Sequence, residues 1–222
     1  IIASAQETGI YPIPGSYSNI KYDDDGRLYI EIGEEKIYEE IAPAAISTEM
    51  MTGSPEGSDQ GIRFDFGDEN FEGLLYYGFI PYGDSKHPHP VYFRTSARIS
   101  GGKAFIEIAK SMSGRYDMIG WEEKKKGTLG YRVINDKGYF LYDGIVTFSG
   151  NAPFKIEPTI IEGPFVNLVT HRGATISFTT NMDIRPAVEV NGARFKGKKG
   201  KIHEIIIDGL EAFKRYDYTI YY

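Results

Sequence analysis

The histidines are the first residues to consider for chemistry, because an imidazole can serve as a metal ligand, a general base or a proton shuttle. The chain has four histidines and no cysteine, which excludes disulfides and thiolate metal sites. His87 and His89 form the only His-x-His pair, and Pro88 between them keeps the backbone extended, so the pair would chelate a metal only weakly. We interpret this stretch as a proline-stiffened surface loop, and we expect no metal and no other cofactor in the chain.

The other two histidines also have structural interpretations. His171 stands beside Arg172 and is most simply a turn residue. His203 alternates with Ile205 and Ile207, which places it at the end of an inward strand face, where a hydrogen bond would satisfy its ring. The sequence offers no Ser-His-Asp arrangement and no glycine-rich phosphate loop before a helix. We therefore expect no catalytic residue in this chain.

Adjacent carboxylates at Asp23–Gly26, in the sequence DDDG, suggest a calcium site at first sight. An EF-hand loop spaces its ligands at alternate positions and ends in a distal glutamate, and this stretch has neither feature. A turn between two strands is the better interpretation, because Asp and Gly are the residues that hairpin turns favour.

The net charge of −6 argues against a nucleic-acid or anionic-membrane partner, because both need clustered cations. The one basic cluster, within residues 194–201, alternates with glycines and is typical of a solvated hairpin. The stretch EEKKK at 122–126 is interpreted as a charged turn. No apolar run approaches the roughly 20 residues that cross a bilayer, so we predict no membrane span.

Aromatic residues crowd one region and are the remaining hint of function. Trp121 is the only tryptophan, and we select it with Tyr82 and Tyr92 as candidates for ligand binding. Aromatic rings stack on sugars, and concave sandwich faces commonly carry such rings, so a glycan is a candidate partner. The alternative is that these rings pack in the core and at the rim of a tyrosine-rich sandwich, together with Tyr76, Tyr77 and Tyr116.

The first residues resemble the end of a signal peptide. Ile1 and Ile2 precede Ala3-Ser4-Ala5, which has the small-x-small form of a cleavage site. This pattern predicts a secreted, periplasmic or cell-surface protein. The alternative is an ordinary tail or strand at the N-terminus.

Alternating apolar residues predict an all-β chain. Ile62, Phe64 and Phe66 fall on one face of a strand, and Leu28, Ile30 and Ile32 do so in another. Short segments of this kind recur along the chain, separated by turns rich in Gly, Asp and Pro. Such a pattern is typical of a sandwich or jelly roll. The single helical candidate is residues 34–42, EEKIYEEIA.

Three prolines between residues 150 and 164 interrupt any sheet ladder that crosses them. We therefore predict two tandem β-sandwich domains. The first, residues 1–155, is a β-sandwich or jelly roll that we assign to no family, and the second covers residues 158–222.

Residues 158–222 resemble the fibronectin type III-like or Ig-like domain at the N-terminal side of purple acid phosphatases and other calcineurin-like metallophosphoesterases. The match rests on GATISFTTN at 173–181, on AVEVNG at 187–192 and on the segment 202–218. In that segment Gly209, Leu210 and Tyr216 occupy the positions of a tyrosine corner, in which the Tyr hydroxyl bonds back to the corner backbone. Phe178 stands where a Trp is common, and Ala212-Phe213 replaces the usual Pro-Gly.

One face of each strand must turn to the partner sheet, so we expect Ala174, Ile176, Phe178, Ile205, Ile207, Leu210 and Tyr216 to be buried. The resemblance implies further that one more strand follows Tyr222 and that a catalytic domain comes after it, unless a strand from residues 140–157 completes the sheet instead. The function it implies is a noncatalytic N-terminal accessory region of an exported metallophosphoesterase, with the catalytic domain as partner. The motifs that hold two metals in such enzymes, Asp-x-His, Gly-Asn-His and Gly-His-x-His, do not occur in this chain. The alternative is a carbohydrate-binding or adhesion module of a bacterial cell surface.

Overall fold

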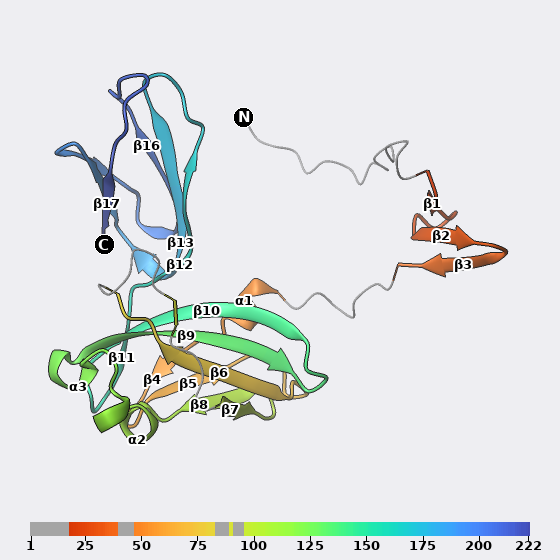
Figure 1. The fold of residues 1–222 in the computed structure, drawn as a ribbon, viewed down its shortest axis with the longest axis horizontal. Helices are drawn as coiled ribbons and strands as arrows, with labels where there is room; N and C mark the ends of the chain where they lie inside the picture. The colour runs from red at the N-terminus through yellow and green to blue at the C-terminus, as the bar shows by residue number, and fades with distance from the viewer. Residues whose placement is uncertain (1–17, 40–46, 83–88, 91–95) are drawn as a thin grey trace. The chain divides into compact units, whose positions relative to one another are not determined.

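A computed structural model describes residues 18–39, 47–82, 89–90 and 96–222. Strands make up 52% of it and helices 8%, which confirms the all-β prediction (Figure 1). The chain divides into two compact units, residues 1–45 and residues 46–222. The second unit holds the two β-sandwiches.

The first unit is an antiparallel meander of β1 (Ile20–Tyr22), β2 (Leu28–Ile32) and β3 (Glu35–Tyr38). The acidic stretch forms the predicted turn between β1 and β2. There the Asp23 carboxylate accepts a bond from the Arg27 backbone N–H at 2.8 Å. This bond is the main reason why the pKa of Asp23 lies below its usual value.

One prediction for this meander is wrong. The helical candidate at 34–42 begins instead as strand β3, which pairs with β2 and continues its hairpin. On β2, Tyr29 is buried while Ile32 is exposed. Tyr29 packs against the Tyr38 ring at 5.5 Å, so a cross-strand aromatic pair decides which face is covered.

The first sandwich has a five-stranded sheet in the order β11-β10-β9-β6-β7 and a three-stranded sheet in the order β4-β5-β8. The larger sheet contains β6 (Gly73–Phe79), β7 (Ser96–Ile99), β9 (Lys126–Asn135), β10 (Phe140–Ser149) and β11 (Lys155–Glu157). The smaller one contains β4 (Glu56–Gly57), β5 (Ile62–Asp65) and β8 (Lys103–Ile106). Short helices connect the strands: α1 (Thr48–Met51), α2 (Ile108–Ser111), η2 (Gly114–Tyr116) and α3 (Trp121–Lys124). Helix α3 occupies most of the predicted charged turn.

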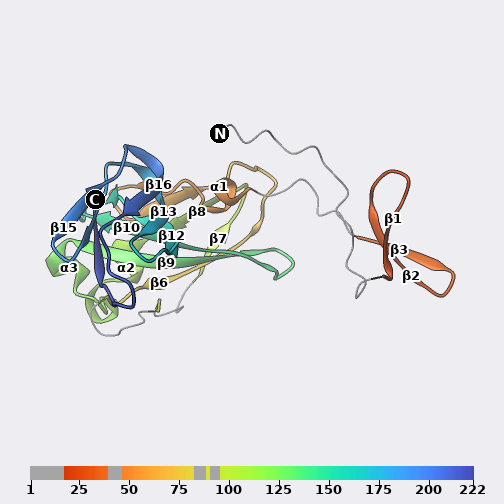
Figure 2. The same ribbon diagram turned by 90° about the horizontal axis from the view of Figure 1, so that it is seen from above.

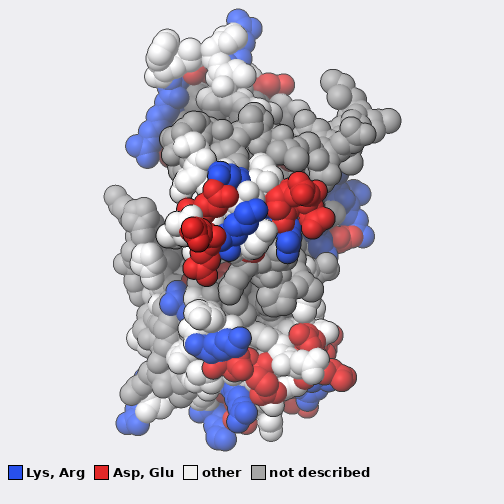
Figure 3. Space-filling model, turned by 90° about the vertical axis from the view of Figure 1, so that its right-hand side faces the viewer, with Lys and Arg blue, Asp and Glu red and all other residues white. Residues whose placement is uncertain are grey.

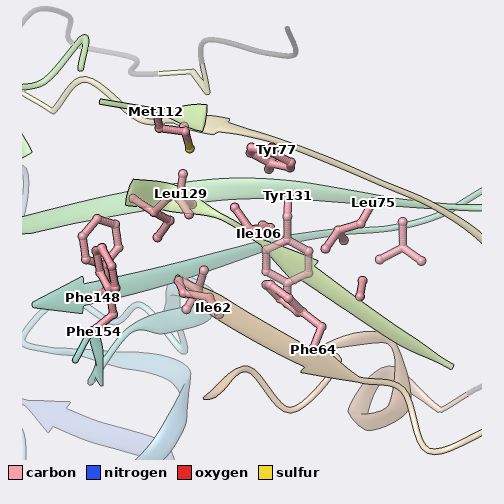
Figure 4. Packing of buried hydrophobic residues seen from close by; sticks show 14 of the residues in the cluster. Ile62, Phe64, Leu75, Tyr77, Ile106, Met112, Leu129, Tyr131, Phe148 and Phe154 are labelled. Carbon is pink, nitrogen blue, oxygen red and sulfur yellow. The ribbon is translucent and has the colours of Figure 1, made fainter. Parts of the chain in front are cut away.

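Alternation along the strands fills the core of this sandwich from both sheets (Figure 4). Ile62, Phe64 and Phe66 are buried as predicted. Tyr131 is also buried, and its hydroxyl donates to the Thr52 carbonyl at 2.8 Å. Burial raises the pKa of Tyr131, so this phenol stays protonated.

The second sandwich packs the sheet β12-β13-β16 against the sheet β15-β14-β17 (Figures 1 and 2). The strands are β12 (Ile160–Asn167), β13 (Ala174–Ile184), β14 (Ala187–Val190), β15 (Ala193–Lys196), β16 (Gly200–Ile207) and β17 (Tyr218–Tyr221). All the predicted inward residues except Ala174, which is only partly buried, lie in or against one cluster. Ile176, Phe178, Ile205 and Ile207 are buried, and Leu210 and Tyr216 pack against them.

The tyrosine corner is present. The backbone N–H of Glu211 donates to the Tyr216 hydroxyl at 3.0 Å, across the connection from β16 to β17. Gly209 takes the left-handed conformation that this connection requires, with φ of +74°. The residues that carry the resemblance therefore have the predicted local geometry.

The predicted domain boundary near residues 155–158 lies inside the second unit, at the place where one hydrophobic cluster gives way to the next. Buried Thr159 connects the two sandwiches, because its hydroxyl accepts from Thr147 N–H at 3.0 Å and its N–H donates to the Asn181 side chain at 2.8 Å. The suggestion that residues 140–157 complete the second sandwich is wrong. Strand β10 pairs with both β9 and β11, and all three belong to the first sandwich.

Candidate functional site

The outer face of the sheet β4-β5-β8 carries an open hollow of about 870 Å³, which we call the polar groove. Its lining includes Glu56, Arg63, Asp65, Lys103 and Phe105, with Arg98 from the neighbouring strand β7. The alternation that buries Ile62, Phe64, Ala104 and Ile106 turns the intervening side chains of β5 and β8 outward into this groove. The same pattern therefore builds the core and positions the groove.

Strand register sets which side chains face one another across the groove. Arg63 lies opposite Glu56 on one side and Phe105 on the other, and Asp65 lies opposite Lys103. The Asp65 carboxylate accepts a bond from the Gly67 N–H at 2.9 Å, which fixes it at the end of β5. Arg98 is within 3.5 Å of Glu72.

The two central cations of the groove remain available to a ligand. In the part of the chain that the structure describes, neither Arg63 nor Lys103 forms an ion pair. The lining holds three cations, Arg63, Arg98 and Lys103, and two carboxylates, Glu56 and Asp65, while Glu72, which pairs with Arg98, balances the third cation from outside the lining. Guanidinium and ammonium groups donate to carboxylates and hydroxyls, and the half-buried Phe105 ring adds an apolar face. The arrangement can bind a polar ligand, and its lining holds no histidine.

Sequence reasoning missed this groove. Arg63, Asp65 and Lys103 are outward residues on alternating strands, and charged residues at such positions are usual on any solvated sheet face. The hollow and the approach of Arg98 from β7 distinguish this face, and neither is visible in a linear pattern.

Trp121 occupies the core of the first sandwich, with 3% of its surface exposed. Its indole N–H donates to the Met112 carbonyl at 2.8 Å. The ring centroids of Phe148 and Phe154 lie 5.9 Å and 5.4 Å from the centroid of the Trp121 ring. Its faces are occupied by protein, so in this arrangement it offers no platform to a sugar.

The other aromatic candidates that the structure describes have different surroundings. Tyr82 is 61% exposed, and its pKa is raised by partial burial and by the neighbouring Tyr222. Tyr92 lies outside the described residues. Tyr77 is buried and its hydroxyl donates to Ser111 at 3.3 Å, which is a packing role. Tyr76 instead lines a second hollow of about 490 Å³ with Leu74 and Ile134 on the five-stranded sheet, while Tyr116 is half-buried.

The histidines fall in separate places. His87 lies outside the described residues, His89 is exposed, and His171 is an exposed turn residue as predicted. His203 is buried at the predicted inward position, 4.8 Å from the Phe178 ring and 3.3 Å from the Thr180 hydroxyl. Burial lowers its pKa, which favours the neutral ring.

The prediction that the basic cluster forms a hairpin is wrong: the cluster runs from β15, which pairs with β14, into β16, which pairs with β13 in the other sheet. Arg194 pairs with Glu189 at 3.1 Å and lies over the Tyr221 ring at 4.3 Å, while the lysines are exposed. Figure 3 shows acidic and basic side chains interleaved on one face of the molecule. Among the described residues, no group of three or more His, Asp or Glu side chains is placed to hold a metal ion. In the described part of the chain, no helix has the length and the apolar character needed to cross a membrane.

Comparison with family models, with curated proteins and with solved structures finds no match for this chain.

Proposed function

We propose that the chain is the noncatalytic N-terminal accessory region of an exported calcineurin-like metallophosphoesterase. The observation that carries this proposal is the corner bond from Glu211 N–H to the Tyr216 hydroxyl, which lies within the residues that resemble such enzymes. In this role the two sandwiches shape the entrance to a catalytic domain and contribute no metal ligand. The parent protein is then a phosphohydrolase.

The free edge of β17 supports a further strand in the second sandwich. Among the described residues β17 pairs only with β14, so its other edge presents unpaired backbone groups. Partly buried Ile220 and Tyr216 lie along this side of the core. An added strand would pair with the edge and cover them, as the resemblance implies for residues after Tyr222.

The test compares residues 1–222 with a polypeptide that continues beyond Tyr222 in the same gene. We expect p-nitrophenyl phosphate to be hydrolysed only by the longer polypeptide, in a manner that manganese, iron or zinc supports and a chelator abolishes. A two-metal site needs about seven or eight converging ligand positions. Chelator-sensitive turnover by residues 1–222 alone, lost in His89→Ala, would contradict the proposal, and so would a longer polypeptide without such activity.

A second candidate function is carbohydrate binding, and the polar groove favours it. Arg63 and Lys103, which form no ion pair among the described residues, lie beside the Phe105 ring in a hollow large enough for a sugar chain of a few units. An acidic glycan suits these two cations. This groove is a different site from Trp121, Tyr82 and Tyr92, the residues selected from the sequence.

Calorimetric titration with neutral and uronic-acid oligosaccharides tests this candidate. If the groove binds them, Arg63→Ala and Phe105→Ala should each weaken binding roughly tenfold or more, since each removes a direct contact. Lys137→Ala, at an exposed turn residue outside the groove, should leave binding unchanged. Equal binding by all three variants would exclude the groove as the site.

A further inference from the structure

Three large apolar side chains are exposed at one end of the second sandwich. Leu168 is 80% exposed, Val169 is 71% exposed, and Phe213 is fully exposed. They come from two connections, β12 to β13 and β16 to β17, which are tied together by a bond from Leu210 N–H to the Arg172 carbonyl at 2.9 Å. We call these three residues the apolar tip.

The backbone conformation at the apolar tip is one that large apolar residues rarely adopt. Leu168 has φ of +47° and Phe213 has φ of +59°, in the left-handed region that Gly and Asn adopt most easily. A large apolar side chain there is disfavoured by its backbone and also by its contact with water. An Asn at either position would avoid both the disfavoured backbone conformation and the exposure of an apolar side chain to water. The presence of Leu168 and Phe213 instead indicates that these side chains are covered in the working protein.

A hollow beside the apolar tip gives this surface a shape that a partner can fill. The hollow measures about 340 Å³ and is lined by Val169, Leu210, Phe213 and Tyr216 among others. Phe213 protrudes next to it, so the surface has both a projecting ring and a recess. Such a surface fits another folded protein domain.

Charge distinguishes a protein partner from a lipid or nucleic-acid partner. The two connections carry three cations, Arg172, Lys214 and Arg215, and three carboxylates, Asp208, Glu211 and Asp217. Three minus three leaves no net charge around the apolar tip, and Lys214 is already paired with Glu211 at 3.1 Å. An anionic membrane or a nucleic acid requires a cation excess that is absent here.

The direction of β17 indicates which domain reaches this surface. β17 begins at Tyr218, directly after the connection that contains Phe213, and runs away from that connection (Figure 1). A strand that pairs antiparallel with the free edge of β17 therefore runs back towards the apolar tip. Polypeptide that followed such a strand would leave the sandwich at the end that carries Leu168, Val169 and Phe213.

We infer that the apolar tip is the docking surface for the catalytic domain of the parent protein, an inference that rests on the proposed function. The test measures hydrogen exchange in residues 1–222 and in the longer polypeptide. Amides of residues 168–173 and 210–217 should exchange at least tenfold more slowly in the longer polypeptide. Similar rates in the two polypeptides would overturn the inference.

Substitutions make the test specific. Leu168→Asn and Phe213→Asn should leave the Tm of residues 1–222 unchanged or raise it, because Asn tolerates the left-handed backbone. In the longer polypeptide each should lower the Tm and remove the slow exchange. Tyr139→Asn, a 65% exposed aromatic in the β9–β10 turn of the first sandwich, is the matched control and should change neither polypeptide's exchange at the tip.

Activity separates the two proposals. If the longer polypeptide hydrolyses phosphate esters and the tip still exchanges rapidly, the docking surface is wrong while the proposed function stands. If the tip is protected in a longer polypeptide that has no metal-dependent activity, the domain that docks is of another kind and both proposals are overturned. Slow exchange at the tip in residues 1–222 alone would show that the chain covers it by itself, which also overturns the inference.

Discussion

The two hydrophobic cores of residues 46–222 obey the same alternation but are built from different parts of the chain. In the second sandwich every fully buried apolar residue comes from a strand, and most are Ile or Val. The first sandwich adds Trp121 from helix α3 and Phe154 from the segment before β11, and these two rings contact each other. The first core is larger than the second, and segments that connect its strands contribute to it. Alternation in the sequence predicts only the core residues that the strands supply.

The largest effect that tests this difference is expected from Phe148→Ala in the first core. Phe148 is buried and contacts the rings of Phe79, Trp121 and Phe154. Its truncation leaves a cavity among three rings, so the free energy of unfolding should fall by about 5 kcal/mol. Denaturant titration followed by Trp121 fluorescence measures this, because the only tryptophan lies in the same core. A change below about 1 kcal/mol would mean that the aromatic cluster does not stabilise this core.

Phe178→Ala makes the equivalent cavity in the smaller core. Phe178 is buried against Ile and Val side chains and the His203 ring, and its truncation should cost about 3 kcal/mol. If the cores unfold independently, the Trp121 transition keeps its midpoint while circular dichroism shows an earlier loss of strand signal. Equal displacement of both signals would show that the Thr159 junction couples the cores.

Gly144→Ala probes how the first core accommodates a tyrosine. Gly144 lies opposite Tyr131 in the β9–β10 ladder, and a Cβ there would come within 2.2 Å of the Tyr131 ring. The ring must move, so we expect a loss of about 2 kcal/mol in the free energy of unfolding. Tyr131→Leu combined with Gly144→Ala should cost less than the sum of the two single changes, because the shorter side chain removes the clash. Simple additivity would contradict the proposed packing.

These cores also show how far the sequence predicts the structure. Period-2 alternation identified Ile62, Phe64, Ile176 and Phe178 as buried, because one face of a strand must meet a partner sheet. It failed for Trp121, since burial on a short helix depends on which connection folds over the sheet. The strand at 35–38 was missed because a solvated two-sided strand has no alternating signal.

The candidate sites follow the same rule. The corner of Tyr216 was predictable because its partner lies five residues away and the motif is local. The polar groove and the apolar tip were not, because each joins residues more than 30 positions apart through sheet register or a bond between connections. Long-range neighbours of that kind depend on the tertiary fold.

A smaller effect is expected at the tyrosine corner of the second sandwich. Tyr216→Phe removes the acceptor of the Glu211 N–H and keeps the ring in place. Because Glu211 is exposed and water can replace the bond, the loss should be about 1 kcal/mol. Tyr218→Phe is the control, since its hydroxyl forms no hydrogen bond within the described residues. Equal stability of both variants would show that the corner bond contributes nothing.

The smallest effect concerns pH and again separates the two cores. Burial lowers the pKa of His203 below its ordinary value of 6.5, although the Lys198 backbone and Asp183 oppose the shift. The unfolded chain therefore binds the proton more readily than the folded chain does, so the stabilisation is complete above pH 6.5 and is lost as the pH falls towards the folded value. Denaturant titrations at pH 7.5 and 5.5 should show a loss on acidification for the second sandwich. That loss should be smaller in His203→Gln, whose amide can still meet Thr180 but does not titrate. The Trp121 transition should not follow His203, and an identical acid response in His203→Gln would mean that other groups cause it.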